Sequence, residues 1–154
     1  MMRTGEAHFT FPVPYEQAAV LEKDEHLKLV AAPSIVTRYL NMNMLQKPFD
    51  DLRVRQAINY GVDRERMIDN VMNGFGTVAY SVGDGMPWSS PDMKCSTDVE
   101  KAKKLLDDGG WTAGADGIRE KDGVRASMNL YYSAGDTVRQ GIAEEFSNQM
   151  KELG

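Results

Sequence analysis

Residue types that build reactive or metal-binding sites are scarce in this sequence. Its 154 residues include one cysteine, Cys95, and two histidines, His8 and His26. A single cysteine excludes an internal disulfide framework, and the histidines have no partners at the spacing of a structural zinc site. The sequence contains no G-x-S-x-G motif, and Gly83-x-Gly85 lacks the third glycine of a dinucleotide site. We therefore predict a protein that is not an enzyme and has no metal site and no cofactor.

Excess positive charge and long apolar runs are lacking as well. Lysine and arginine number 18 against 23 acidic residues, which gives a net charge of -5. Nucleic-acid binding needs clustered cations, so nucleic acid is excluded as a partner. No run approaches the ~18 apolar residues of a membrane span. The start, Met1 to Glu6, has no apolar h-region, so we expect no signal peptide in this sequence.

The most regular part of the chain, Pro48 to Phe75, predicts two helices in succession. The first has apolar residues at i, i+3, i+4, i+7 and i+8, namely Val54, Ala57, Ile58, Gly61 and Val62. Asp50 or Asp51 is its predicted N-cap, and Asp63 is the N-cap of the second helix. The second helix continues the apolar face with Met67, Ile68, Val71, Met72 and Phe75.

Period-two alternation and helix-capping signals predict the remaining elements. Strands are predicted over residues 7–11, 27–31, 35–44 and 126–132. Helices are predicted after Pro14, after a capping box that begins at Thr97, and after Asp136, with a tight hairpin turn at Asp122-Gly123. The initial strand, helix and strand are typical of an α/β protein. Between the helical regions lies a long loop, in which we expect Trp88 to pack over the core.

Four motifs resemble those of the family 5 solute-binding proteins, the extracytoplasmic receptors of peptide and nickel ABC importers. Tyr39 to Asn43 is similar to a Y-L-x-x-N strand, and Pro48 to Ile68 is similar to P-F-D-D-x-R-V-R-Q-A-I-x-Y-x-V-D-R-x-x-I with almost no departures. Asp98 to Trp111 is similar to D-P-E-K-A-K-A-L-L-x-x-A-G-W. The hairpin from Trp111 to Gly123 is closest to the nickel-type branch. His8 stands where the family usually has aspartate.

The resemblance implies an α/β periplasmic-binding-protein-like type II fold, present in part as an incomplete lobe with a mixed sheet and flanking helices. Residues 1–36 would be a strand-helix-strand segment of lobe I. Residues 37–154 would be a partial lobe II with the hinge strand, the paired helices, a long loop, a hairpin and a C-terminal helix. Such receptors close two lobes on a ligand by hinge motion.

The same resemblance implies the function and the location. The intact protein would capture dipeptides or oligopeptides in the periplasm, or at the cell surface when membrane-anchored, and deliver them to an inner-membrane ABC permease. A nickel chelate is the alternative solute. Phe11, Pro12 and Val13 on the lobe I side, with Tyr39 and Asn41 at the hinge, are the implied ligand-binding residues. Tyr39 and Asn41 fit a structural role equally well, as hydrogen-bonding partners of neighbouring strands.

The same sequence features are compatible with a second function, which belongs to another class of protein. An incomplete lobe would leave unpaired backbone at a sheet edge, and such an edge favours self-association. The alternative hypothesis is therefore an α/β interaction module that forms a homodimer through an open sheet edge and has no solute of its own.

Overall fold

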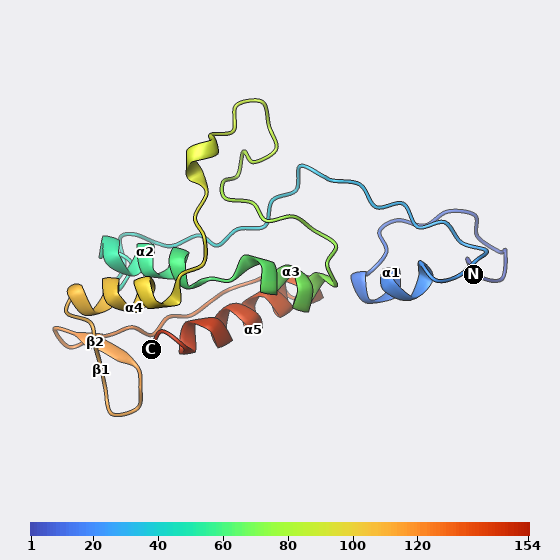
Figure 1. Ribbon diagram of the computed structural model, residues 1–154. Helices are drawn as coiled ribbons and strands as arrows, with labels where there is room; N and C mark the ends of the chain where they lie inside the picture. The colour runs from blue at the N-terminus through green and yellow to red at the C-terminus, as the bar shows by residue number, and fades with distance from the viewer.

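The computed structural model describes residues 1–154, except for the side chain of Pro91. Its elements are α1 (Tyr15–Leu21), α2 (Leu52–Gly61), α3 (Arg64–Met72), the 3-10 helix η1 (Pro91–Met93), α4 (Val99–Asp108), β1 (Thr112–Ala113), β2 (Arg119–Lys121), β3 (Val124–Arg125) and α5 (Thr137–Lys151). Helices α2 to α5 and the sheet gather in one body, whereas α1 and the N-terminus lie beyond one end of it (Figure 1). No helix in the described part of the chain is long and apolar enough to cross a membrane.

The hydrophobic core forms where α2, α4 and α5 meet. Its buried residues are Val54, Ala57, Ile58, Val62, Ala102, Leu106, Trp111, Phe146 and Leu153. Ala57 and Ala102 are almost fully enclosed, and their small side chains let α2 and α4 approach closely. The core confirms the predicted apolar face of α2, and Asp51 is the N-cap, with its side chain accepting the N–H of Arg53.

Two glycines allow α5 and the residues after it to lie against the paired helices. A Cβ on Gly61 would lie 2.5 Å from Cδ1 of Leu153, and one on Gly141 would lie 2.8 Å from Cγ1 of Val71. Cβ atoms in proteins essentially never lie within 3.0 Å of such a neighbouring heavy atom, so both distances are too short. A larger residue at either position would therefore push the C-terminal segment away from α2 or α3.

A capping residue on α4 differs from the prediction. Thr97 was expected to cap the helix, but the N-cap is Asp98, whose side chain accepts the N–H of Lys101 at 2.9 Å. The Thr97 hydroxyl donates instead to the carbonyl of Val62 at 3.0 Å, and the Asp98 N–H donates to the carbonyl of Tyr60 at 2.7 Å. The start of α4 is thereby tied to the end of α2.

The sheet is small and entirely antiparallel, with strand order β1-β2-β3. Glu120 pairs with Thr112 on one side and with Arg125 on the other. Asp122 and Gly123 connect β2 to β3 with φ angles of 51° and 75°, and a two-residue hairpin turn needs positive φ at both positions. The predicted hairpin is therefore confirmed, and with the flanking helices the chain is of the α/β class. The predicted mixed sheet is wrong for these residues.

Four predicted strands do not form. They are residues 7–11, 27–31, 35–44 and 126–132. An extended segment becomes a strand only where a neighbouring segment bonds its N–H and C=O groups. The N–H of Ala126 donates to the carbonyl of Arg119 in β2 at 2.8 Å, but this single bond is not a ladder. Among the described residues no ladder joins any of the four segments to another, and the initial strand-helix-strand unit is accordingly absent. The alternation itself survives over residues 126–131, where half-buried and exposed residues take turns.

The prediction that Trp88 packs over the core is wrong. Its side chain is 75% exposed on a loop that projects away from the helices (Figure 1). The loop is held by Asp84, whose carboxylate accepts the N–H of Tyr80 at 2.6 Å and the hydroxyl of Ser89 at 2.8 Å. These hydrogen bonds, that of Tyr80 first, lower the pKa of Asp84 below its ordinary value. The loop is thus closed by its own polar contacts.

Candidate functional site

The predicted ligand-binding residues before α1 lie at the surface. Phe11 is 83% exposed, Pro12 is exposed and Val13 is half-buried. The helix that follows them contacts the main body through Tyr15, which stacks on Phe75 with ring centroids 6.2 Å apart. This contact places residues 11–13 beyond the end of α3.

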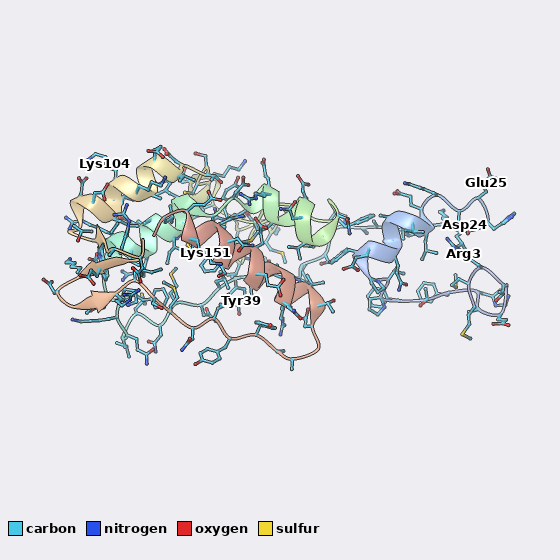
Figure 2. The ribbon with its side chains drawn as sticks, turned by 90° about the horizontal axis from the view of Figure 1, so that it is seen from below. Arg3, Asp24, Glu25, Tyr39, Lys104 and Lys151 are labelled. Carbon is cyan, nitrogen blue, oxygen red and sulfur yellow. The ribbon has the colours of Figure 1, made fainter. Side chains whose placement is uncertain are left out.

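The other two predicted residues lie on the extended segment 35–44. Tyr39 is 64% exposed and Asn41 is exposed, whereas Met42 packs against the core. Figure 2 shows Tyr39 near α5 and far from Arg3 and Asp24 of the N-terminal part. Segment 35–44 therefore runs along the main body and presents Tyr39 to solvent.

The structure does not bring the two groups of predicted residues together. Among the described residues, no hydrogen bond, ion pair or aromatic contact joins residues 11–13 to Tyr39 or Asn41. All of them remain accessible, and exposed aromatic side chains recur on the irregular segments. These aromatics are Phe9, Phe11, Tyr39, Trp88, Tyr131 and Tyr132.

Two open hollows flank α5, and neither contains a predicted ligand-binding residue. A hollow of about 440 Å³ is lined by Leu130, Tyr132, Ala143, Glu144, Ser147, Asn148 and Lys151. A second of about 290 Å³ is lined by Glu16, Asn70, Val71, Thr137, Gly141, Glu144, Glu145 and Asn148. The first lies between α5 and residues 130–132, and the second lies between α1, α3 and α5. Both are open to solvent.

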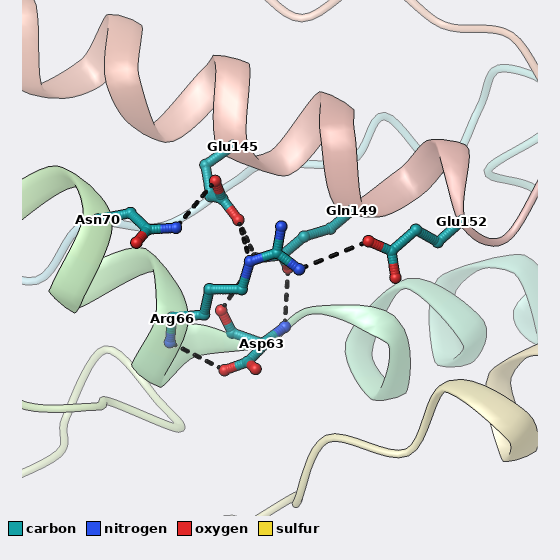
Figure 3. Close-up of polar contacts among 6 residues, drawn as sticks. All are labelled: Asp63, Arg66, Asn70, Glu145, Gln149 and Glu152. Atoms are coloured by element: carbon teal, nitrogen blue, oxygen red, sulfur yellow. Dashed lines mark hydrogen bonds and ion pairs between the residues drawn. The ribbon is translucent and has the colours of Figure 1, made fainter.

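The scaffold behind the exposed segments is held by polar side chains, the first of which is Gln149. Its amide oxygen accepts the N–H of Asp63 at 2.8 Å, and its nitrogen donates to the carbonyl of Asp63 at 3.2 Å (Figure 3). Glu145 accepts from the same amide nitrogen at 2.9 Å and pairs with Arg66 at 2.9 Å. Because Gln149 is only 3% exposed, this amide fixes α5 on the junction between α2 and α3.

The second polar anchor is Arg119 at the start of β2. Its Nε donates to the carbonyl of Leu153 and its Nη1 to that of Trp111, both at 2.6 Å. Nη1 also pairs with Asp107 at 2.5 Å, and the backbone N–H donates to Gly154. Arg119 is 8% exposed, so one buried guanidinium joins α4, the sheet and the C-terminal residues.

The third anchor is Asp51, which joins two of the sequence motifs. Besides capping α2, its carboxylate accepts from the indole Nε1 of Trp111 and from Nζ of Lys121, each at 3.1 Å. Burial opposes ionisation of Asp51, but the N–H of Arg53, the indole and the lysine together lower its pKa below the ordinary value. Hydrogen bonds from Asp51 thus join the motif that begins at Pro48 to the hairpin motif of residues 111–123.

Of these three anchors, the sequence predicted only Asp51, and only its role as a helix cap. Asp51 was identified as a possible cap, whereas its bonds to the hairpin, and the roles of Arg119 and Gln149, were missed. Gln149 and Asp63 are separated by 86 positions, and Arg119 and Leu153 by 34. No local pattern signals such contacts; the only clue was that Arg119 falls inside the hairpin motif.

The surface of the chain offers a ligand apolar and aromatic side chains. In the described part of the chain, no three His, Cys, Asp or Glu side chains lie where they could share a metal ion. His8 and His26 are exposed, and Cys95 is half-buried and free. What the chain presents is apolar and aromatic surface on extended segments, supported by a well-bonded scaffold.

Comparison with known proteins shows the family of the chain. The model of the bacterial extracellular solute-binding proteins, family 5, matches residues 1–154. Among curated proteins, the glutathione-binding protein GsiB of Salmonella typhimurium is 36% identical over 155 residues. That match covers 100% of this chain and 28% of the relative, so the chain spans little more than a quarter of the relative's length.

Solved structures give the same result for the fold. The oligopeptide-binding protein AppA from Bacillus subtilis, in complex with a nonapeptide, has a TM-score of 0.76 at 32% identity, covering 92% of this chain and 29% of that one. NikZ from Campylobacter jejuni, in complex with Ni(L-His), has a TM-score of 0.80 at 26% identity, with the same coverage. The chain therefore has part of an α/β periplasmic-binding-protein-like type II fold, as predicted.

Proposed function

The chain belongs to the bacterial extracellular solute-binding proteins of family 5, and from that membership we propose that it is part of a receptor that captures short peptides for an ABC importer. The full match of the family model carries the proposal. The receptor works outside the cytoplasm, in the periplasm or anchored at the cell surface, and passes its solute to an inner-membrane permease. It performs no chemical reaction on the solute.

Peptides are the proposed solute class because two of the compared proteins bind them. GsiB is named for glutathione, which is a tripeptide, and AppA was solved with a nonapeptide. A nickel chelate is the second candidate, since NikZ was solved with Ni(L-His) at the higher TM-score. The lack of a shared metal-ligand group among the described residues fits capture of a preformed chelate as well as capture of a peptide.

We assign residues 1–36 to lobe I and residues 37–154 to lobe II. The separation of α1 from the body that contains α2 to α5 supports the division (Figure 1). Phe11, Pro12 and Val13 would contact the solute from the first lobe, and Tyr39 and Asn41 from the connecting segment. Their exposure supports the assignment, because lobe closure on a solute needs accessible side chains on both sides.

Self-association is the competing function from another class. The unpaired extended segments favour it, because free backbone groups can pair with a second copy. Size-exclusion chromatography with light scattering separates the two: a monomer at all concentrations removes the interaction module, and a dimer that binds no solute removes the receptor.

A thermal-shift screen tests the proposed function. Dipeptides, glutathione, longer peptides and nickel with histidine are added to this chain and to a protein of the relatives' length that carries it. A solute at a hundredfold excess over its Kd should stabilise the native state by ~2.7 kcal/mol. For a domain of this size that corresponds to a rise in Tm of about 5–10 °C.

The outcome separates the solute classes. Stabilisation by peptides but not by nickel with histidine supports the peptide receptor, and the reverse result supports the chelate receptor. If no solute raises the Tm of either protein, the proposed function is wrong.

A further inference from the structure

Three segments of the chain meet at the N-terminus of α5. They are the extended segment 35–44, the residues that precede α5, and α5 itself. Nη1 of Arg38 lies 3.7 Å from a carboxylate oxygen of Asp136, and Arg139 lies 3.2 Å from the same oxygen. Arg139 also donates through Nη1 to the hydroxyl of Ser133 at 2.8 Å. A single carboxylate is therefore shared by two arginines from different parts of the chain.

The side chain of Asp136 is held by a hydrogen bond to its own helix, independently of Arg38. It is the N-cap of α5, and its Oδ1 accepts the N–H of Arg139 at 2.9 Å. That bond is the leading cause of the lowered pKa of Asp136, so the carboxylate is ionised at neutral pH. Its side chain is 30% exposed and that of Arg38 is 34% exposed, so the pair is partly shielded from solvent.

Arg38, the partner of Asp136, is adjacent in the sequence to the proposed ligand-binding residues. Arg38 directly precedes Tyr39 and lies three positions before Asn41 in the same extended segment. No backbone hydrogen bond from residues 38–41 reaches the rest of the described chain. Segment 35–44 is held to the body by the packing of Met42 at one end and by Arg38 at the other.

We propose that Asp136 is a positioning residue for solute binding, which holds Tyr39 and Asn41 through Arg38. The inference has two parts. The second part, the effect of Asp136 on solute binding, rests on the proposed function. The first part, the docking of residues 38–41 on the N-terminus of α5, is independent of any ligand. Lobe closure then acts on a segment that is already tied to one lobe.

Backbone order parameters from NMR relaxation test the docking. Asn is as good an N-cap as Asp, so Asp136→Asn removes the charge and keeps the helix. We expect order parameters of residues 38–41 to fall from about 0.85 to below 0.6, the range of a flexible backbone, with α5 unchanged. Arg38→Gln should give the same loss without touching a helix, and the double variant should lose no more than either single one.

Asp98→Asn is the matched control, because Asp98 caps α4 in the same way and its carboxylate accepts from Lys101. It should leave residues 38–41 unchanged. Unchanged order in Asp136→Asn and Arg38→Gln, or an equal loss in Asp98→Asn, would overturn the docking.

The effect on the solute is measured with the peptide that gives the largest thermal shift. Freeing the segment lowers the binding-competent fraction, so Asp136→Asn should raise the apparent Kd by up to about fivefold, the range of a partly exposed ion pair. Lost order with an unchanged Kd would overturn the positioning role and leave the proposed function intact. Failure of every solute to bind would instead overturn the proposed function, and with it the positioning role, whereas the order parameters would still decide the docking.

Discussion

Replacing Arg119 with methionine should lower the free energy of unfolding by about 3 kcal/mol. Methionine keeps much of the buried volume but has no donor. The carbonyls of Leu153 and Trp111 then lose their hydrogen bonds inside the protein, where water does not replace them. The loss of Asp107 as a partner adds little, because that side chain is 63% exposed and can be hydrated.

Urea unfolding followed by circular dichroism measures the effect, with Arg125→Met as the matched control. Arg125 lies on the neighbouring strand, and its ion pair with Asp116 is exposed on both sides. We expect that change to have little effect on stability, because both partners of the ion pair stay hydrated. Equal losses in the two variants would show that the guanidinium of Arg119 does not join the C-terminal residues to the sheet.

Replacing Asp51 with alanine should cost about 2 kcal/mol at neutral pH, the second-largest effect on stability. About half of this is the loss of the α2 cap, and the rest is the loss of the acceptor for the Trp111 indole and for Lys121. Asp98→Ala is the control, since Asp98 caps α4 and its side chain accepts no indole; it should cost about 1 kcal/mol.

The contribution of the Asp51 charge should also depend on pH. The pKa of Asp51 is lower in the folded chain than its ordinary value of 3.8. A carboxylate with a lowered folded pKa stabilises the protein above the unfolded pKa, and this stabilisation is lost as the pH falls through the folded pKa. The difference in unfolding free energy between the protein and Asp51→Asn should therefore be full at pH 7 and shrink below about pH 4. A difference that is constant between pH 7 and pH 3 would contradict ionisation of Asp51 as its source.

The helices were predictable because their signals are local. Asp51, Asp63 and Asp136 each cap the helix that follows, and the apolar stripe of α2 is the stripe that forms the core. The hairpin was equally local, because Asp122-Gly123 carries the positive φ angles that its turn needs. Such features depend on a few adjacent residues and not on the rest of the fold.

The strands and the scaffold contacts were not predictable in the same way. Period-two alternation correctly gives the half-buried side over residues 126–131 and fails at Tyr132, which is exposed. Whether a strand forms depends on a partner segment elsewhere. The bonds of Gln149 and Arg119 join residues far apart in the chain, so their burial follows only from the packed structure. The proposed ligand residues came from the resemblance alone, and no composition or periodicity would have selected Tyr39.

The most direct test of the receptor account is isothermal titration calorimetry of the best stabilising peptide against Tyr39→Ala. Trp88→Ala is the control, because Trp88 is comparably exposed at 75% but lies on the projecting loop outside the proposed site. If Tyr39 contacts the solute, its loss should weaken binding at least about tenfold, or 1.4 kcal/mol, while Trp88→Ala binds as the unchanged protein does. Unaltered affinity in Tyr39→Ala, or an equal loss in both variants, would contradict a solute site at the segment that carries Tyr39.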